Sequence, residues 1–122
     1  MQADDHVSDR SFETPDLDRV VDQGLQHVPF DDEYVDGVAI NVGDGSMVFV
    51  SWHHIAHSVT VRWTKHEHEL VVIDRELCSE VSLIHHHEGW RCRVLYGGLG
   101  FAGELRVLIG ERVQIFDGLL ET

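Results

Sequence analysis

Hydrophobic residues recur at helical spacing in one N-terminal stretch of the sequence. Thr14 is a good N-cap residue, Pro15 suits the first turn of a helix, and Asp16 favours the positive end of the helix dipole. Pro29 ends the pattern because it lacks a backbone N–H. The pattern therefore predicts an amphipathic helix over residues 14–28. Its apolar face would contain residues spaced by three and four: Leu17, Val20, Val21, Gly24, Leu25 and Val28.

From residue 36 to residue 117 the pattern changes to short segments in which apolar and polar residues alternate, which is typical of β-strands. Residues 70–73 are apolar without interruption, which predicts a strand buried on both faces. Glu88 and Gly89 predict a two-residue hairpin turn. Because the connections are short, neighbouring strands are expected to be antiparallel. The remaining strand segments are residues 38–42, 47–52, 59–64, 81–85, 91–96, 105–109 and 113–116.

These elements predict an α+β fold with one N-terminal helix packed on an antiparallel sheet. The sheet would be a strongly twisted meander or partial barrel of about seven to eight strands. A length of 122 residues and a hydrophobic content of 43% fit a single folded domain. We expect residues 1–13 to form a mobile acidic arm, and residues 14–122 to form the domain.

The charge of the chain is strongly negative and unevenly distributed. There are 22 acidic and 9 basic residues, for a net charge of −13. Residues 1–45 hold 12 acids and 2 bases, net −10, whereas residues 46–122 hold 10 acids and 7 bases, net −3. An acid excess argues against direct binding to nucleic-acid phosphates or anionic lipid, because like charges repel.

The acidic N-terminal part suggests a small non-enzymatic binding module, similar in size and charge to inhibitors and immunity proteins. Such a module would engage a basic protein partner, and electrostatic attraction would speed the association. The candidate partner-binding residues are Asp16, Asp18, Asp22, Asp31, Asp32, Glu33 and Asp36. The sequence leaves the partner and the oligomeric state open. A second explanation of an acid-rich chain with a single lysine is adaptation to a cytoplasm of high salt concentration.

Histidines suggest a different chemistry, because neutral imidazole is a common ligand of zinc and other transition metals. Eight of the ten histidines lie between residues 53 and 87. A turn at residues 88 and 89 would place His85 opposite Cys92, and residues two apart on a strand share a face. The alternative function is therefore a metal-binding protein or a metal-dependent enzyme. Its candidate ligands are His66, His68, His85, His87 and Cys92. The same histidines could instead form a solvated rim or respond to pH.

Other motifs give no positive evidence for an enzyme. Residues 98–103 fit the GxGxxG pattern, but the alternation of Leu105, Val107 and Ile109 predicts a strand where a dinucleotide fold needs a helix. The glycines are better explained as a turn or bulge between strands. No serine lies in a nucleophile motif, so we predict neither catalytic residues nor a cofactor.

The sequence also predicts where the protein resides. Its first residues lack the basic start and apolar run of a secretory signal, and no apolar stretch approaches the length of a membrane span. The two cysteines, Cys78 and Cys92, have no CxxC spacing and are expected to be reduced. We therefore expect a cytoplasmic protein.

Overall fold

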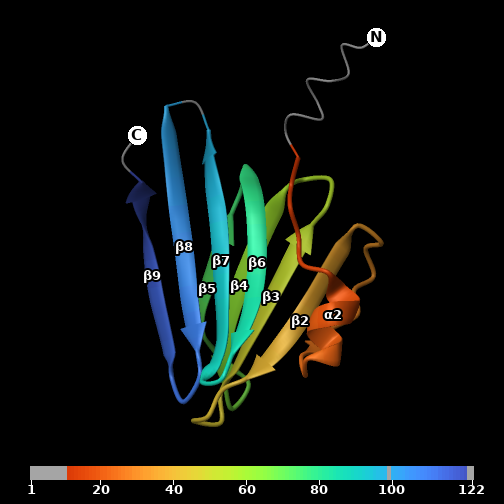
Figure 1. The fold of residues 1–122 in the computed structure, drawn as a ribbon, viewed down its shortest axis with the longest axis vertical. Helices are drawn as coiled ribbons and strands as arrows, with labels where there is room; N and C mark the ends of the chain where they lie inside the picture. The colour runs from red at the N-terminus through yellow and green to blue at the C-terminus, as the bar shows by residue number, and fades with distance from the viewer. Residues whose placement is uncertain (1–10, 99, 121–122) are drawn as a thin grey trace.

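Nine β-strands and one short helix form the part of the chain that the computed structural model describes, residues 11–98 and 100–120 (Figure 1). Their order is α2 (Leu17–Asp22), β1 (Gln26–His27), β2 (Val35–Asn41), β3 (Met47–His53), β4 (Ser58–Lys65), β5 (His68–Arg75), β6 (Cys78–His86), β7 (Gly89–Gly98), β8 (Phe101–Ile109) and β9 (Val113–Leu120).

The strands form two antiparallel sheets. One has the order β1-β2-β3-β4-β5 and the other has the order β6-β7-β8-β9, so each strand pairs with its neighbour in sequence. The prediction of antiparallel pairing is confirmed. The predicted α+β class, with a helix covering a single sheet or partial barrel, is wrong. Alternation along a strand indicates only that one face is buried, and here the second sheet covers that face.

The chain passes from the first sheet to the second at a sharp corner between β5 and β6. Leu77 adopts φ 57° there, a left-handed conformation that is uncommon for a residue other than glycine. Backbone hydrogen bonds hold both sides of the corner: the Leu77 carbonyl accepts from the N–H of Gly97, and the Cys78 N–H donates to the carbonyl of His57. The two sheets therefore separate at a position that has no glycine or proline to mark it.

The predicted helix over residues 14–28 is wrong in extent, because α2 has only six residues. Asp16 caps it, accepting a hydrogen bond from the Arg19 N–H at 3.3 Å. The helix ends at Asp22, and Gly24, which follows the C-cap residue Gln23, adopts φ 118°. The N–H of Gly24 donates to the carbonyl of Val21, and that of Leu25 donates to the carbonyl of Val20, which is the Schellman arrangement. Gly24 is thus a helix terminator, and the chain beyond it continues into β1.

A single hydrophobic core lies between the sheets. Alternate residues of β3, such as Val48, Val50 and Trp52, point inward and are almost completely buried. On the facing sheet, Cys92 and Val107 are 0% exposed. Val20 and Leu25 from the helical region join the same core.

Strand β5 differs from its prediction. Residues 70–73 do form part of a strand, but Leu70 and Val72 are 49% and 43% exposed. Because β5 is an edge strand whose outer side has no second layer, the expectation of burial on both faces is wrong.

The N-terminal part of the predicted arm, residues 1–10, lies outside the described residues. Glu13 pairs with β6 in a parallel bridge, its N–H donating to the carbonyl of Ser79 and its carbonyl accepting from the N–H of Val81. Phe12 packs against the core. In the described ranges no helix has the length and apolar character needed to cross a membrane.

Candidate protein-binding surface

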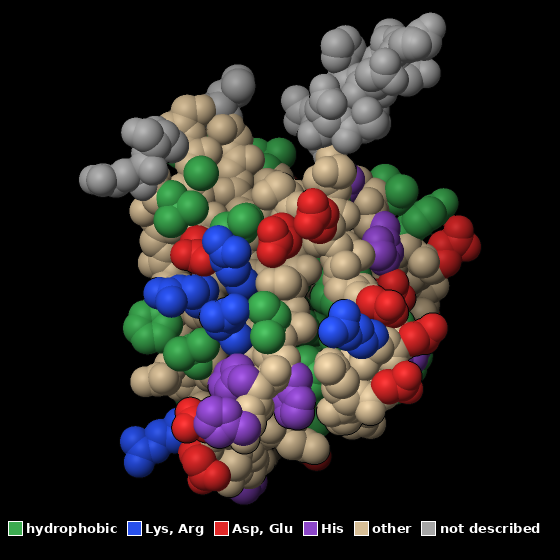
Figure 2. Space-filling view, viewed as in Figure 1, with side chains coloured by type: hydrophobic (Ala, Val, Ile, Leu, Met, Phe, Trp, Pro, Cys, Tyr) green, Lys and Arg blue, Asp and Glu red, His purple; other side chains and the backbone are tan. Residues whose placement is uncertain are grey.

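The acidic residues selected from the sequence lie on two neighbouring parts of the molecule. Asp16, Asp18 and Asp22 belong to α2 or its cap, whereas the other four precede or begin β2. Acidic side chains gather on the side where α2 lies, whereas basic side chains gather over the sheet of β6 to β9, which faces the viewer (Figure 2). We call the set of Asp31, Asp32, Glu33 and Asp36 the acidic turn.

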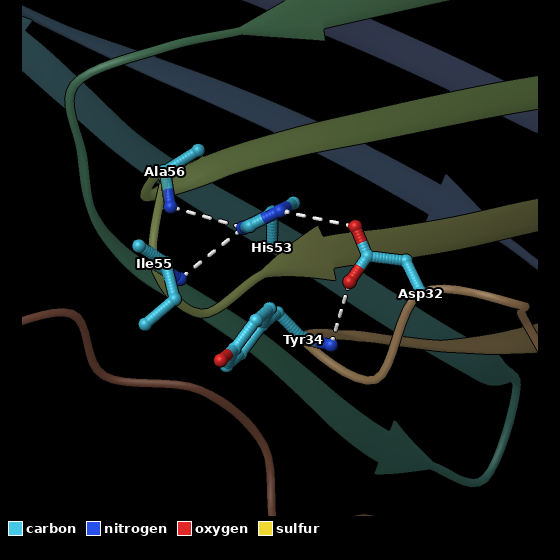
Figure 3. A network of polar contacts seen from close by, with 5 residues as sticks. All are labelled: Asp32, Tyr34, His53, Ile55 and Ala56. Carbon is cyan, nitrogen blue, oxygen red and sulfur yellow. Dashed lines mark hydrogen bonds and ion pairs between the residues drawn. The ribbon is translucent and has the colours of Figure 1, made fainter.

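Hydrogen bonds give the acidic turn a defined shape (Figure 3). One Asp32 oxygen accepts from the Tyr34 N–H at 2.8 Å, and the other lies 3.3 Å from Nε2 of His53. Nδ1 of His53 accepts from the backbone N–H groups of Ile55 and Ala56, at 3.2 and 3.0 Å. Since Nδ1 is an acceptor, the ring proton lies on Nε2 and can be donated to Asp32. The β3–β4 turn thus fixes the position of the Asp32 carboxylate.

A second histidine holds the other end of the acidic turn. Nε2 of His54 lies 2.7 Å from a carboxylate oxygen of Asp36. The Tyr34 ring stacks on His53 with ring centroids 6.1 Å apart. Tyr34 and Ile55 are 46% and 66% exposed, so large apolar side chains lie beside the carboxylates.

Apolar and aromatic groups next to charged groups are characteristic of protein interfaces. Sequence analysis missed Tyr34 and Ile55 as candidates, because neither belongs to a motif and only the fold brings them to the acidic turn.

The outer face of the five-stranded sheet carries an open groove of about 640 Å³. Its apolar part includes Val28, Phe30, Met47 and Phe49, and its polar part includes the ion pair between Arg62 and Glu69. Nε of Arg62 lies 3.1 Å from the Glu69 carboxylate. Phe30, which packs against Gly37 on β2, immediately precedes the acidic turn. The groove therefore continues the apolar character of this side of the molecule, and sequence analysis did not anticipate it.

The outer face of the four-stranded sheet has the opposite charge. Arg91 and Arg93 from β7 point away from the core, and Arg93 is directly opposite Arg106 on β8. Glu104 accepts from Nε of Arg93 at 2.5 Å and lies 3.9 Å from Nε of Arg106. Figure 2 shows Lys and Arg side chains gathered over the sheet of β6 to β9. Like charges opposite one another weaken strand pairing, so this arrangement has an energetic cost.

The residues proposed as metal ligands do not come together. His66 lies in the β4–β5 turn and His68 begins β5, in one sheet. In the other sheet, His85 lies near the end of β6 and His87 lies in the β6–β7 turn. Among the described residues, no three His, Cys, Asp or Glu side chains are placed to hold one metal ion.

The predicted hairpin register that supported the metal site is wrong. Cys92 pairs with Leu83 rather than with His85, because the turn lies at residues 87 and 88 and Gly89 already pairs with His86. His85 pairs with Trp90, and their ring centroids are 4.7 Å apart. Burial in the apolar core raises the pKa of the Cys92 thiol to about 12.

The glycine-rich segment 98–103 connects two strands, as the sequence suggested. Gly98 ends β7, pairs with Phe101 and is followed by β8, so a strand stands where a dinucleotide-binding fold would have a helix. An added Cβ at Gly103 would lie 2.4 Å from the Tyr96 ring. Because Gly103 has no side chain, the Tyr96 ring of the neighbouring strand can lie directly over its backbone.

The described elements define an antiparallel β-sandwich with charged surfaces of opposite sign. No protein-family model and no curated protein matches the sequence. The fold is similar to that of a chain in the contact-dependent growth inhibition toxin–immunity protein complex from Klebsiella pneumoniae 342. The TM-score is 0.72 at 12% identity, with 89% of this chain and 97% of that chain covered. At this identity the likeness establishes the fold alone.

Proposed function

We propose that the chain is a small binding protein of the immunity-protein kind, which acts by engaging another protein rather than by catalysis. The observation that carries this proposal is the similarity of fold, over nearly the whole of both chains, to a member of a toxin–immunity protein complex. The acidic turn supports it further, because its carboxylates are held by hydrogen bonds and lie beside the exposed side chains of Tyr34 and Ile55.

The proposed partner surface is basic, and it contacts the acidic turn and the acidic residues of α2. Preorganised carboxylates lose little side-chain freedom on binding, since His53 and His54 already restrict Asp32 and Asp36. Exposed aromatic and aliphatic side chains would supply the apolar centre of the interface, with the charges directing the approach. The function is therefore recognition of a basic surface that has an apolar centre.

The proposal is tested by capturing partners from the protein's own cells with three forms of the full chain. The first is the natural sequence, and the second carries Asp31→Asn, Asp32→Asn and Glu33→Gln. Asn at position 32 keeps the oxygen that accepts from the Tyr34 N–H. The third is a matched control that neutralises the arginine face, with Arg91, Arg93 and Arg106 each changed to Gln.

We expect one basic protein to bind stoichiometrically to the natural and control forms. Its association rate with the acidic-turn variant should fall at least about tenfold at low salt. Expression of that protein alone should arrest growth, and co-expression of the natural chain should restore it. The absence of a stoichiometric partner, or equal binding by the first two forms, would contradict the proposal. Folding that requires molar salt would instead favour adaptation to a saline cytoplasm.

A further inference from the structure

The two sheets have four edge strands, and three of them are protected against pairing with another chain. β1 is only two residues long, and β6 is bridged by Glu13. β5 carries charged residues at both ends, including Glu69 and Asp74, and its pairing with β4 is interrupted between Trp63 and Thr64. Short strands, covering segments, charges and irregular pairing are the usual means of protecting sheet edges.

Among the described residues, the fourth edge strand, β9, has none of these features. It pairs with β8 over eight residues in an unbroken register, from Ile109 opposite Val113 to Ala102 opposite Leu120. Its sequence, VQIFDGLL, contains no lysine, arginine or proline. The single charged residue, Asp117, is engaged within the molecule by Arg75 and by the hydroxyl of Tyr96. The strand therefore presents a long, regular and nearly neutral edge.

The second half of β9 exposes large apolar side chains. Phe116, Leu119 and Leu120 are 46%, 71% and 43% exposed. A shallow hollow of about 470 Å³ lies over β8 and β9; Glu104 and Arg106 of β8 line it together with β9 residues such as Phe116 and Leu119. A Cβ added at Gly118 would meet nothing within 4 Å. Residues 116–120 are all exposed, and among the described residues β8 is the only strand that pairs with β9.

We propose that β9 pairs antiparallel with β9 of a second copy of this chain, which joins the two four-stranded sheets into one sheet of eight strands. A twofold axis allows the same edge to serve both copies and closes the assembly at a dimer. A register centred on Ile115 or Phe116 places Asp117 opposite Val113 or Ile115, so no like charges face each other. The neutral edge also lets two acidic chains approach where their repulsion is weakest.

Sedimentation equilibrium of the full chain across the micromolar range tests this dimer. We expect twice the chain mass of 13.9 kDa. The test variant is Gln114→Lys with Leu119→Lys, since both side chains are exposed and lysine is a natural edge protector. Its dimer should dissociate at least about tenfold more readily, because each copy would bring two added cations into the new interface. The matched control, Leu70→Lys with Val72→Lys, adds the same charge at other exposed positions and should leave the dimer unchanged.

Amide hydrogen exchange identifies the surface involved. In the natural chain, protection of β9 should increase with protein concentration, and in the test variant it should not. A monomer throughout the concentration range would overturn the proposal. So would a dimer that survives the two lysines on β9, or one that the control variant disrupts equally. These outcomes are independent of the capture experiment, because they require no second protein.

Discussion

Cys92 provides a direct test of the packing between the sheets, through the dependence of stability on alkaline pH. The residue is 0% exposed and lies between Leu83 and Val107 on the neighbouring strands. Burial raises the pKa of its thiol from 9.0 to about 12, since ionisation would place an anion in an apolar core. The unfolded chain therefore ionises first as pH rises. The stabilisation from the neutral buried thiol is complete below pH 9 and is lost as pH approaches 12.

The size of this effect follows from the two pKa values. Each pH unit between them corresponds to about 1.36 kcal/mol of folding free energy. At about pH 10.5 the thiol of the unfolded chain is largely ionised and that of the folded chain is not, so the loss is about 2 kcal/mol. In Cys92→Ala this contribution is absent. The substitution itself costs about 1–2 kcal/mol for the lost packing, and this cost should be the same at every pH.

Urea unfolding of the natural chain and of Cys92→Ala, followed by circular dichroism between neutral pH and about pH 10.5, measures the difference. Above pH 9 the natural chain should lose stability more steeply than the variant, so the free energies of unfolding of the two proteins converge as pH rises. Val94→Ala, another core truncation at a fully buried position, should remain parallel to the natural chain because it removes no titrating group. A constant difference between Cys92→Ala and the natural chain would show that Cys92 does not lie in a dry core.

Two further predictions concern close packing and a buried hydroxyl. Gly89→Ala should destabilise the fold by at least about 2 kcal/mol, because an added Cβ would lie 2.0 Å from a carbonyl oxygen of β8 and φ is 143°. Gly118→Ala is the control for thermal unfolding and should change stability little, so equal losses would contradict the β7–β8 packing. Ser46→Ala should cost about 1–3 kcal/mol, because the hydroxyl of this buried serine accepts from Nε1 of Trp63 at 2.9 Å and donates to Asp44. Unchanged urea midpoints for Ser46→Ala would show that water replaces the hydroxyl.

Local patterns were sufficient to predict strands, but not their arrangement into two sheets. Alternation of Val59, Val61 and Trp63 marks a strand with one buried face wherever the covering layer comes from. The separation depends on the corner at Leu77, where an ordinary leucine takes a left-handed conformation. That conformation is maintained by hydrogen bonds to Gly97 and between Cys78 and His57, which are distant in sequence. Hydrogen bonds between residues so far apart in sequence cannot be predicted from the residues of the turn.

The helix was overextended for a related reason. Leu25 lies at the spacing expected for a helix and is buried, so its position in the pattern is correct although its conformation is not. The Schellman turn at Gly24 redirects the chain while keeping Leu25 in contact with the core. Burial and helical conformation are therefore separate properties here, and periodicity reports only the first.

At the candidate site, the sequence was sufficient to identify the acidic residues but not the side chains that surround them in the fold. The acidic turn could be selected because Asp31, Asp32 and Glu33 are consecutive. Its association with His53 and His54 depends on the pairing of β2 with β3, which places Val35 opposite His53. The predicted register of the β6–β7 hairpin was wrong because moving the turn by one residue shifts each cross-strand partner by two, so His85 faces Trp90 rather than Cys92.

The fold also changes what the net charge of −13 implies. At physiological salt, charges are screened over about 8 Å, so a partner responds to the surface it contacts more than to the total charge. The repulsion of anions argued from the sequence applies at the acidic turn. It does not apply at the outer face of β7 and β8, which carries Arg91 and where Arg93 and Arg106 flank Glu104. Capture experiments at low salt therefore favour partners that bind the acidic side, because the long-range attraction of a basic partner to the whole negative chain adds to the local attraction. At physiological salt the two faces act independently, and neutralising one should leave binding at the other unchanged.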